Sequence, residues 1–341
     1  MPGSSLRLER AQILAFRRRV GGLDKRLPPG PPSLRRAAWA GLQDSMPRAA
    51  LLSIHARVQG TEPSTWEDSS LVQIWGPRFS VFVVAASDLA IFSLGVLPED
   101  DKRRRRAEDL AERVRAYLSG KREAYGEVGR AMGLRDPYML RYAAATGTVL
   151  LRWDGARQPT IWSVPAPQMD PRDARLELAR RYLHSYGPAT AEAFGWWSGI
   201  GSPAGTVAFE DLQSSLTPVQ TPVGDAWILT ADEEAFRAAP QAAAKARLLP
   251  SGDSFLLLQG ADRDLLVPET GRRDQLWTTR VWPGGLLIDG EVAGTWRRAN
   301  AVITVQQWRS LTSAEREAVT AEGQSLPVPG LERPLAVRWA E

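Results

Sequence analysis

The residues GLQDSMPRAALL at positions 41–52 decide the fold of this chain. Apolar residues on both sides of a short polar turn predict one helix before the turn and another, from Ala49 to Arg57, directly after it. The turn itself presents an amide in Gln43, a carboxylate in Asp44 and a hydroxyl in Ser45. Polar groups held between two packed helices indicate a candidate site.

The sequence around the turn predicts helices followed by a strand-rich run. A helix is expected over 9–20, and the prolines at 28–32 break the chain after it. Ser33 is expected to cap a second helix that continues to Leu42. A β-rich run follows at 79–84. Helices followed by a hairpin are typical of winged-helix units.

The same order recurs twice further along the chain. Two β-rich runs flank Asp154 and Gly155, which predicts a hairpin, and the helix that opens at Thr190 precedes another pair of strands. The last hundred or so residues consist mostly of short strands, expected at 255–258, 285–289, 291–296 and 301–305. We therefore expect three helix–hairpin units and a C-terminal β segment, at 1–97, 98–170, 171–235 and 236–341.

Composition limits the chemistry that the chain can perform. The 341 residues contain no cysteine and only two histidines, so we expect no disulfide, no thiolate chemistry and no histidine-based metal site. No motif in the chain implies a cofactor, and we expect none. No apolar run is long enough to cross a membrane, and we expect a cytoplasmic, monomeric protein without a membrane partner. The net charge of +4 is carried mostly by arginine, whose fork binds phosphate. A GC-rich genome gives the same arginine bias.

The polar turn resembles the LQAQDPRAALL signature of a bacterial winged-helix family that includes the azinomycin-resistance DNA glycosylase. Two further stretches, RRYLHSYGPATAEAFGWWSGI at 180–200 and LLIDGEVAGTWR at 286–297, are similar to blocks of that family. The resemblance implies an α+β fold of tandem winged-helix units closed by a small C-terminal β-barrel. It also implies a monofunctional glycosylase that excises bulky alkylated or crosslinked purines from double-stranded DNA, in the service of resistance to a natural product.

The family's turn carries a Gln-x-Gln or Gln-x-Asp pair that orients the attacking water. Gln43 matches the first member, whereas Ser45 occupies the position of the second. Gln43 either orients a water or caps a helix end. Asp44 is either a general base or a residue that serves a helix terminus or pairs with an arginine. Phe82 replaces a family histidine, and it is either a core residue or part of a lesion pocket.

Several arginines are candidates for phosphate contacts. Arg48, Arg57 and Arg78 surround the turn, and two more arginines lie on the helix before it, Arg35 and Arg36. The leading prediction is thus a DNA glycosylase. The alternatives are a non-catalytic winged-helix protein, for damage recognition or transcriptional regulation, and a small-molecule or protein-binding module that uses the C-terminal segment.

Overall fold

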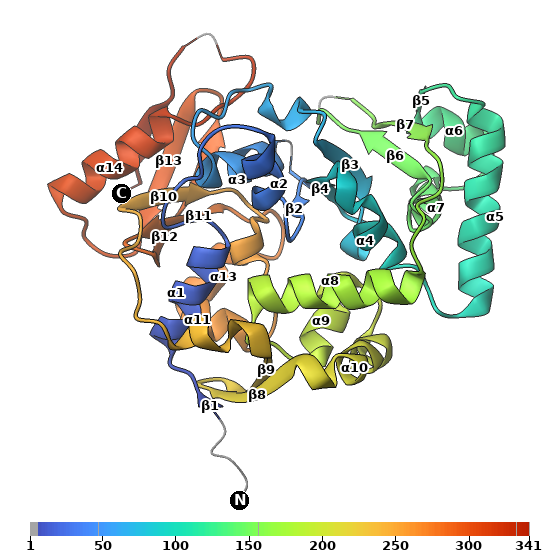
Figure 1. Cartoon of the computed structure of the whole chain (residues 1–341). Coiled ribbons are helices and arrows are strands. Elements are labelled where there is room, and N and C mark those ends of the chain that lie inside the picture. The colour runs from blue at the N-terminus through green and yellow to red at the C-terminus, as the bar shows by residue number, and fades with distance from the viewer. Residues whose placement is uncertain (1–5, 47, 156, 332, 341) are drawn as a thin grey trace, which may run out of the picture.

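The computed structural model describes residues 6–46, 48–155, 157–331 and 333–340. It is a mixed α+β fold with three separate sheets, and the helices lie between and around them (Figure 1). Apolar side chains form a large central core and several smaller ones under the individual segments. In the described residues no helix is both long and apolar enough to cross a membrane.

The first segment places two helices, a short strand and a third helix before a hairpin. The helix after the polar turn has the expected bounds, and the first helix begins one residue later than expected. Ser33 does not cap the second helix: that helix begins at Pro31 after Gly30, because proline suits the first helical position, and Ser33 is buried inside it. The elements are α1 (Arg10–Val20), α2 (Pro31–Ala37), β2 (Leu42–Gln43), α3 (Ala49–Arg57), β3 (Leu71–Trp75), β4 (Val81–Ala85) and α4 (Leu89–Leu94).

The second segment repeats the order and shares a sheet with the first. Its hairpin at Asp154 and Gly155 is confirmed. Gln73 of β3 pairs with Leu151 of β6, which joins the two hairpins into one six-stranded sheet of order β2-β4-β3-β6-β7-β5. The elements are α5 (Asp101–Leu118), β5 (Glu123–Ala124), α6 (Tyr125–Ala131), η4 (Pro137–Leu140), α7 (Arg141–Ala144), β6 (Val149–Arg152) and β7 (Thr160–Ser163).

The third segment packs an aromatic cluster beneath the first. Thr190 caps α9 as expected, since its hydroxyl accepts a hydrogen bond from the Ala193 amide at 3.1 Å. Trp197 is buried, whereas its neighbour Trp196 is 60% exposed. Strand β1 (Leu6–Arg7) returns from the N-terminus to pair with β8. The other elements are α8 (Pro171–Tyr186), α9 (Ala191–Ser198), α10 (Ser202–Asp211), β8 (Leu216–Thr221), β9 (Gly224–Leu229) and α11 (Glu233–Arg237).

The C-terminal segment is an open sheet, which corrects the expected barrel. The five strands run in the order β10-β11-β12-β13-β14, and within the described residues β10 and β14 are edges that do not pair with each other. Helix α14 packs on both edge strands, so a helix lies where a closing strand pair would be needed. The elements are β10 (Ala246–Leu249), α12 (Asp262–Leu266), α13 (Thr270–Leu276), β11 (Gly284–Ile288), β12 (Glu291–Ala299), β13 (Val302–Gln307), α14 (Ser313–Gln324) and β14 (Ala336–Trp339).

The strand expected at 255–258 is also absent. The Asp253 carboxylate accepts a hydrogen bond from the Phe255 amide at 2.9 Å, and the chain turns into a short 3-10 helix, η7 (Ser254–Leu256). The Asp253 side chain thus takes the hydrogen bond that a neighbouring strand would otherwise supply, and residues 255–258 do not form a strand.

Candidate active site

The polar turn begins on the edge strand of the six-stranded sheet. Gln43 in β2 faces Phe82 in β4, and the next amide, of Asp44, donates to the Val81 carbonyl at 2.7 Å. Successive side chains of an extended chain point to opposite sides. Gln43 and Ser45 therefore share the more accessible side, while Asp44 is only 1% exposed. Phe82 is fully buried, which places it in the core.

Gly41 fixes where this strand starts. Its φ is +73°, and a Cβ at this position would lie 2.8 Å from the Phe92 ring and 3.0 Å from the Phe82 ring. Both the backbone conformation and the close aromatic packing favour glycine. The turn is thus pressed against two core rings before it reaches Gln43.

The Gln43 amide is held from both ends. The Arg78 guanidinium donates through Nη2 to Gln43 Oε1 at 3.0 Å, and Gln43 Nε2 donates to Ser45 Oγ at 3.0 Å. Because arginine can only donate, its contact sets which end of the amide is the oxygen. One lone pair of Oε1, one N–H of Nε2 and the Ser45 hydroxyl remain for a further partner. This arrangement can both donate to and accept from one water molecule.

Arg78 was expected at a DNA phosphate, and the structure gives it a different task. It is half-buried and also donates to the Trp197 carbonyl, so it links the turn to α9. Burial lowers the pKa of the Arg78 guanidinium from its ordinary value, yet arginine remains protonated. Among the described residues no carboxylate pairs with Arg78, and its positive charge therefore stays uncompensated beside Gln43.

Asp44 is buried below the turn. Its two oxygens accept hydrogen bonds from the Ala50 amide at 3.0 Å and from Gln73 Nε2 at 2.8 Å. Desolvation by burial raises the pKa of Asp44 to about 7, and the two hydrogen bonds oppose that rise. The carboxylate thus serves the first turn of α3, and it faces away from the side on which Gln43 and Ser45 lie.

Gln73 is a site residue that the sequence analysis missed. It is 3% exposed, donates to Asp44, and accepts from the Trp153 amide at 2.7 Å. Through it the second segment's hairpin reaches the turn. A single amide inside the apolar strand LVQIW at 71–75 was the available signal, because a buried polar side chain needs partners.

Arg57 was also expected at DNA, and the structure corrects that expectation. It is 2% exposed and forms two hydrogen bonds with Asp253, at 2.7 and 2.8 Å. The same guanidinium donates to the Ser53 carbonyl and to Ser254 Oγ. A fully committed, buried guanidinium cannot contact a phosphate, so Arg57 is an interior ion pair.

Arg48 is engaged in a stack between the first two segments. Its guanidinium lies 3.8 Å from the centre of the Trp66 ring, and that of Arg152 lies 3.7 Å from the same ring. Arg48 also donates to the Trp153 carbonyl at 3.3 Å. Arg48 is the N-cap residue of α3 with φ +67°, and its side chain reaches the β6–β7 hairpin that contains Trp153.

Arg35 and Arg36 are exposed on α2, and in the described part of the chain neither forms an ion pair. The pKa of Asp68 is lowered, mainly because Ser70 donates hydrogen bonds to its carboxylate. The nearby charge of Arg35 lowers this pKa further. Of the arginines predicted to bind DNA, these two keep the accessibility that a phosphate contact requires.

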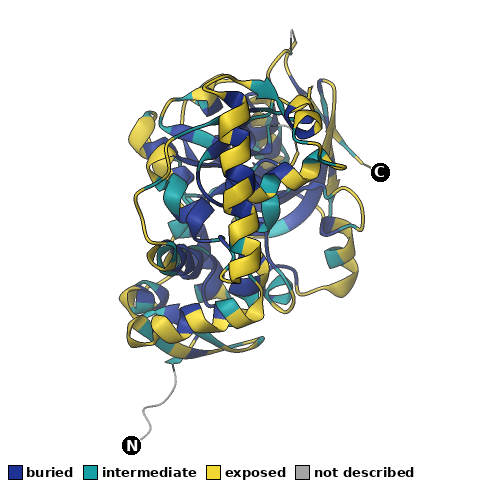
Figure 2. Ribbon diagram, turned by 90° about the vertical axis from the view of Figure 1, so that its right-hand side faces the viewer, coloured by how far each residue is buried: buried dark blue, intermediate teal, exposed yellow. Residues whose placement is uncertain are grey.

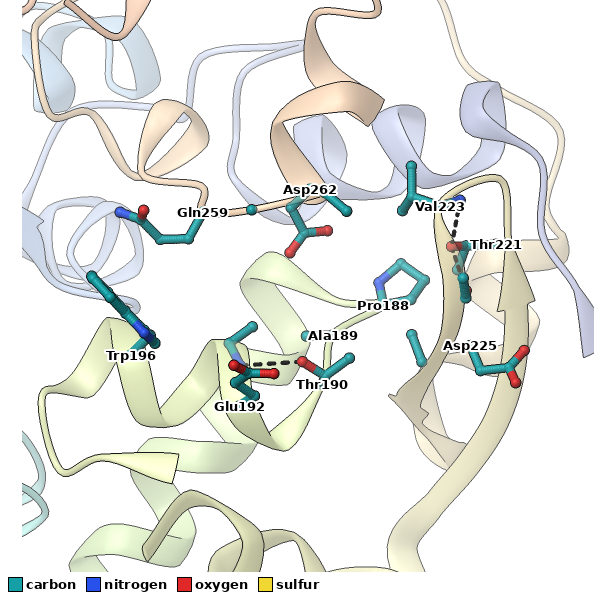
Figure 3. Close-up of a pocket in the computed structure, with 15 residues that line it drawn as sticks. Pro188, Ala189, Thr190, Glu192, Trp196, Thr221, Val223, Asp225, Gln259 and Asp262 are labelled. Atoms are coloured by element: carbon teal, nitrogen blue, oxygen red, sulfur yellow. Dashed lines mark hydrogen bonds between the residues drawn. The ribbon is translucent and has the colours of Figure 1, made fainter. Parts of the chain in front are cut away.

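A well-formed cavity of about 440 Å³ lies elsewhere, between α9, the β8–β9 hairpin and α12 (Figure 3). Three carboxylates line it, from Glu192, Asp225 and Asp262, and no lysine or arginine does. Asp262 pairs with Arg17 at 3.2 Å, whereas in the described residues Glu192 and Asp225 form no ion pair. Two carboxylates without a partner repel a polyanion such as DNA. The cavity in Figure 3 is therefore separate from the polar turn in both position and chemistry. In the described residues no group of three or more carboxylate or imidazole side chains is arranged to hold a metal ion.

Comparisons with known proteins agree with one another. The chain is 30% identical over 158 residues to the interstrand DNA cross-link repair glycosylase of Streptomyces sahachiroi, and this match covers 45% of the chain and 42% of that protein. The match thus spans less than half the length of the curated relative. The solved structure of Streptomyces sahachiroi DNA glycosylase AlkZ superposes with a TM-score of 0.79 at 21% identity, over 98% of this chain and 100% of that one.

The family resemblance extends over most of the chain. The family model described as DNA glycosylase AlkZ-like matches residues 36–327, a range that includes the polar turn, all three hairpins and most of the C-terminal sheet. The chain belongs to the AlkZ-like DNA glycosylase family.

Proposed function

We propose that this protein is a monofunctional DNA glycosylase that hydrolyses the N-glycosidic bond of alkylated or crosslinked purines in double-stranded DNA. The observation that carries the proposal is the Gln43 amide, fixed between Arg78 and Ser45 at the sheet edge. The sequence and structural relatives, both DNA glycosylases by name, support the same activity. A DNA substrate implies a cytoplasmic location, and we propose that the chain acts as a monomer.

The three helix–hairpin segments would act as winged-helix units on the duplex. We propose their bounds as 1–97, 98–170 and 171–235, followed by the C-terminal segment 236–341. Each segment places helices before an antiparallel hairpin, which is the element order of that motif. Arg35 and Arg36 are the proposed phosphate contacts because they are the exposed members of the arginine set.

Excision of an N7-alkylated purine does not require the protein to protonate the leaving base. When the purine carries an alkyl group at N7, the base is already cationic, and the bonding electrons leave with it to give a neutral base. The sugar becomes an oxocarbenium-like cation, and a water oxygen then bonds to its anomeric carbon. The protein must hold that water in place. We assign this role to Gln43 and Ser45, which offer an N–H donor and oxygen acceptors to one water.

No general base is required at Asp44. Its oxygens are occupied by Ala50 and Gln73, and it is buried on the far side of the turn. After the water oxygen has bonded to the anomeric carbon, that oxygen is strongly acidic and loses its proton to solvent, so Gln43 and Ser45 need only hold the water in place. Arg78 is a positioning residue in this scheme, because it acts on the water only through the orientation of the Gln43 amide.

The test is release of the base from an N7-alkylguanine duplex, measured as strand cleavage after alkali treatment. Gln43→Ala should lower the excision rate about 100-fold, or about 3 kcal/mol, and leave DNA affinity nearly unchanged, since an oriented water matters mainly in the transition state. Gln213→Ala removes an exposed glutamine outside the site and serves as the matched control.

Ser45→Gln would place a longer amide beside Gln43 and should raise excision above the parent's rate. If the parent releases no base from any alkylated duplex, and Ser45→Gln does not change this, the glycosylase proposal fails. Salt-dependent DNA binding without excision would then support the non-catalytic alternative. That alternative is favoured by Ser45 and Phe82, which replace a polar residue and a histidine of the family.

A further inference from the structure

A second cavity lies directly behind the turn between β3 and β4. Its volume is about 540 Å³, and it opens where this turn meets α5, the η4–α7 helices and the loop between α9 and α10. All three helix–hairpin segments thus contribute to its walls. In Figure 2 the long vertical helix that faces the viewer is α5, and its outer face is exposed along most of its length.

This cavity and the Gln43 site share one wall. Arg78 and Phe79 are consecutive residues with φ of +55° and +54°, a conformation that is uncommon outside glycine. Arg78 turns its side chain to Gln43, whereas Phe79 lines the cavity. Gly199 lines it too, and a Cβ there would approach the Arg78 backbone nitrogen to 3.0 Å. The wall is therefore tightly packed on both sides.

The floor of the cavity is aromatic and apolar. The Phe79 and Tyr142 rings meet edge to face, with centres 4.8 Å apart. Tyr142 is 43% exposed and Met139 is 47% exposed, which leaves ring and thioether surface open to solvent. Exposed aromatic side chains next to a cavity offer a face on which a planar group can stack.

The rim of the cavity is positively charged. Arg103 and Arg106 project from exposed positions on α5, and in the described part of the chain neither forms an ion pair. The other charged lining residues, Glu99 and Arg175, pair with each other. A planar group tethered to an anion therefore fits both features at once. A nucleotide has this chemistry, with a base that stacks and a phosphate that pairs with arginine.

We propose that this cavity receives one unpaired nucleotide of the bound DNA, with its base on Phe79 and Tyr142 and its phosphate on Arg103 or Arg106. The inference rests on the proposed DNA binding and adds a subsite to it. A base removed from the stack at this place would lie across the Arg78–Phe79 wall from the amide of Gln43. The acidic cavity of Figure 3 offers no such phosphate contact.

The experiment compares affinity for two duplexes of equal length, one fully paired and one with a single unpaired base. Stacking of a base on an aromatic side chain contributes about 1 to 3 kcal/mol, so the parent should bind the duplex with the unpaired base at least about 5-fold more tightly. Tyr142→Ala should remove most of this preference. Tyr138→Ala is the matched control, because Tyr138 is equally exposed but does not line the cavity.

A second pair of variants tests the rim. Arg103→Gln with Arg106→Gln should weaken binding and reduce its salt dependence, whereas Arg105→Gln, on the same helix but outside the cavity, should change both less. Circular dichroism and thermal unfolding confirm that each variant is folded. Equal affinity of the parent for the two duplexes, or a preference that survives Tyr142→Ala, overturns the proposal.

Base excision is measured separately on an alkylated, fully paired duplex, so that the two proposals can fail independently. Excision without a preference for the unpaired base removes the nucleotide subsite alone. A preference without excision keeps the subsite and removes the glycosylase activity. Absence of any DNA binding at low salt overturns both.

Discussion

Arg57 and Arg78 both lie near the polar turn and both point into the protein. A carboxylate neutralises the charge of Arg57, whereas Arg78 contacts only uncharged groups. Arg57 meets the Asp253 carboxylate through two hydrogen bonds in an interior that excludes solvent. Arg78 meets an amide oxygen and a backbone carbonyl, both uncharged. The first arrangement cancels charge, whereas the second leaves a net positive charge beside the group proposed to hold the water.

The difference separates a residue that holds the fold from one that prepares a site. A buried arginine with a carboxylate is balanced within the protein and has nothing left to offer a ligand. A half-buried arginine with neutral acceptors keeps its field, and in a low-dielectric surrounding that field acts more strongly than at the surface. Variants at these positions should therefore differ in kind: one changes stability and the other changes rate.

The largest expected effect is on stability. Arg57→Ala leaves the Asp253 carboxylate buried without its partner, and we expect the free energy of unfolding to fall by about 3 to 5 kcal/mol. Urea denaturation measures the change, and Arg35→Ala, at an exposed position, should stay within about 0.5 kcal/mol of the parent. A loss below about 1 kcal/mol would mean that the buried pair acts no differently from an exposed one.

The next effect is on rate. Arg78→Met removes a charged donor to Gln43, and base excision should fall roughly 30- to 100-fold, about 2 to 3 kcal/mol. Because Arg78 acts through Gln43, adding Gln43→Ala to this variant should cost little more. Single-turnover excision by the parent, both single variants and the double variant forms the cycle. Losses that add fully would show that the two residues act separately.

The pH dependence of stability is the third effect. With a folded pKa of about 7 against an ordinary value of 3.8, Asp44 holds its proton more tightly in the folded state. The folded state therefore binds more protons between about pH 4 and 7, and stability falls as the pH rises through this window. Asp44→Asn should remove this decline, so that the stability difference between pH 5 and 8 changes by about 2.5 kcal/mol.

His55 titrates over part of the same range with the opposite sign. Burial, aided by Arg26 and Arg247, lowers the pKa of His55 to about 3, and its effect is a stability that rises with pH up to about 6.5. The difference between the parent and Asp44→Asn cancels this contribution. Asp109→Asn, an exposed carboxylate on α5, is the control. Parallel pH profiles for parent and Asp44→Asn would contradict the assignment.

The smallest effect is on the salt dependence of binding. Arg35→Gln with Arg36→Gln should leave folding unchanged and reduce the slope of log K against log salt by about 0.9 for each phosphate contact that is lost. Titrations of a duplex at several salt concentrations measure the slope. An unchanged slope would remove α2 from the proposed DNA interface and leave the arginines of α5 as the next to test.

Local signals in the sequence predicted the local structure well. The bounds of α3, the cap at Thr190 and the hairpin at Asp154 and Gly155 all follow from a few neighbouring residues, and all are confirmed.

Distant partners could not be predicted in the same way. Asp253 lies 196 residues beyond Arg57, and no spacing rule connects them. The same holds for Arg78, whose acceptor in α9 is 119 residues away. An arginine beside a polar turn suits a phosphate, an amide or a carboxylate equally well, and only the packing of other segments decides among them. The barrel prediction was wrong for a related reason, because nothing in the strands shows that α14 covers both edges.

Because the first two segments share the six-stranded sheet, one of them cannot be exchanged in evolution without affecting the other. Strand β3 pairs with β4 on one side and with β6 on the other, and its Gln73 holds both Asp44 and Trp153. If recombination replaced the second segment with one that lacked these contacts, β3 would lose its pairing with β6, and Gln73 would keep Asp44 but lose the backbone of Trp153. The polar turn would be preserved only if the hairpin of the new second segment placed a backbone N–H and C=O where those of Trp153 now bind Gln73.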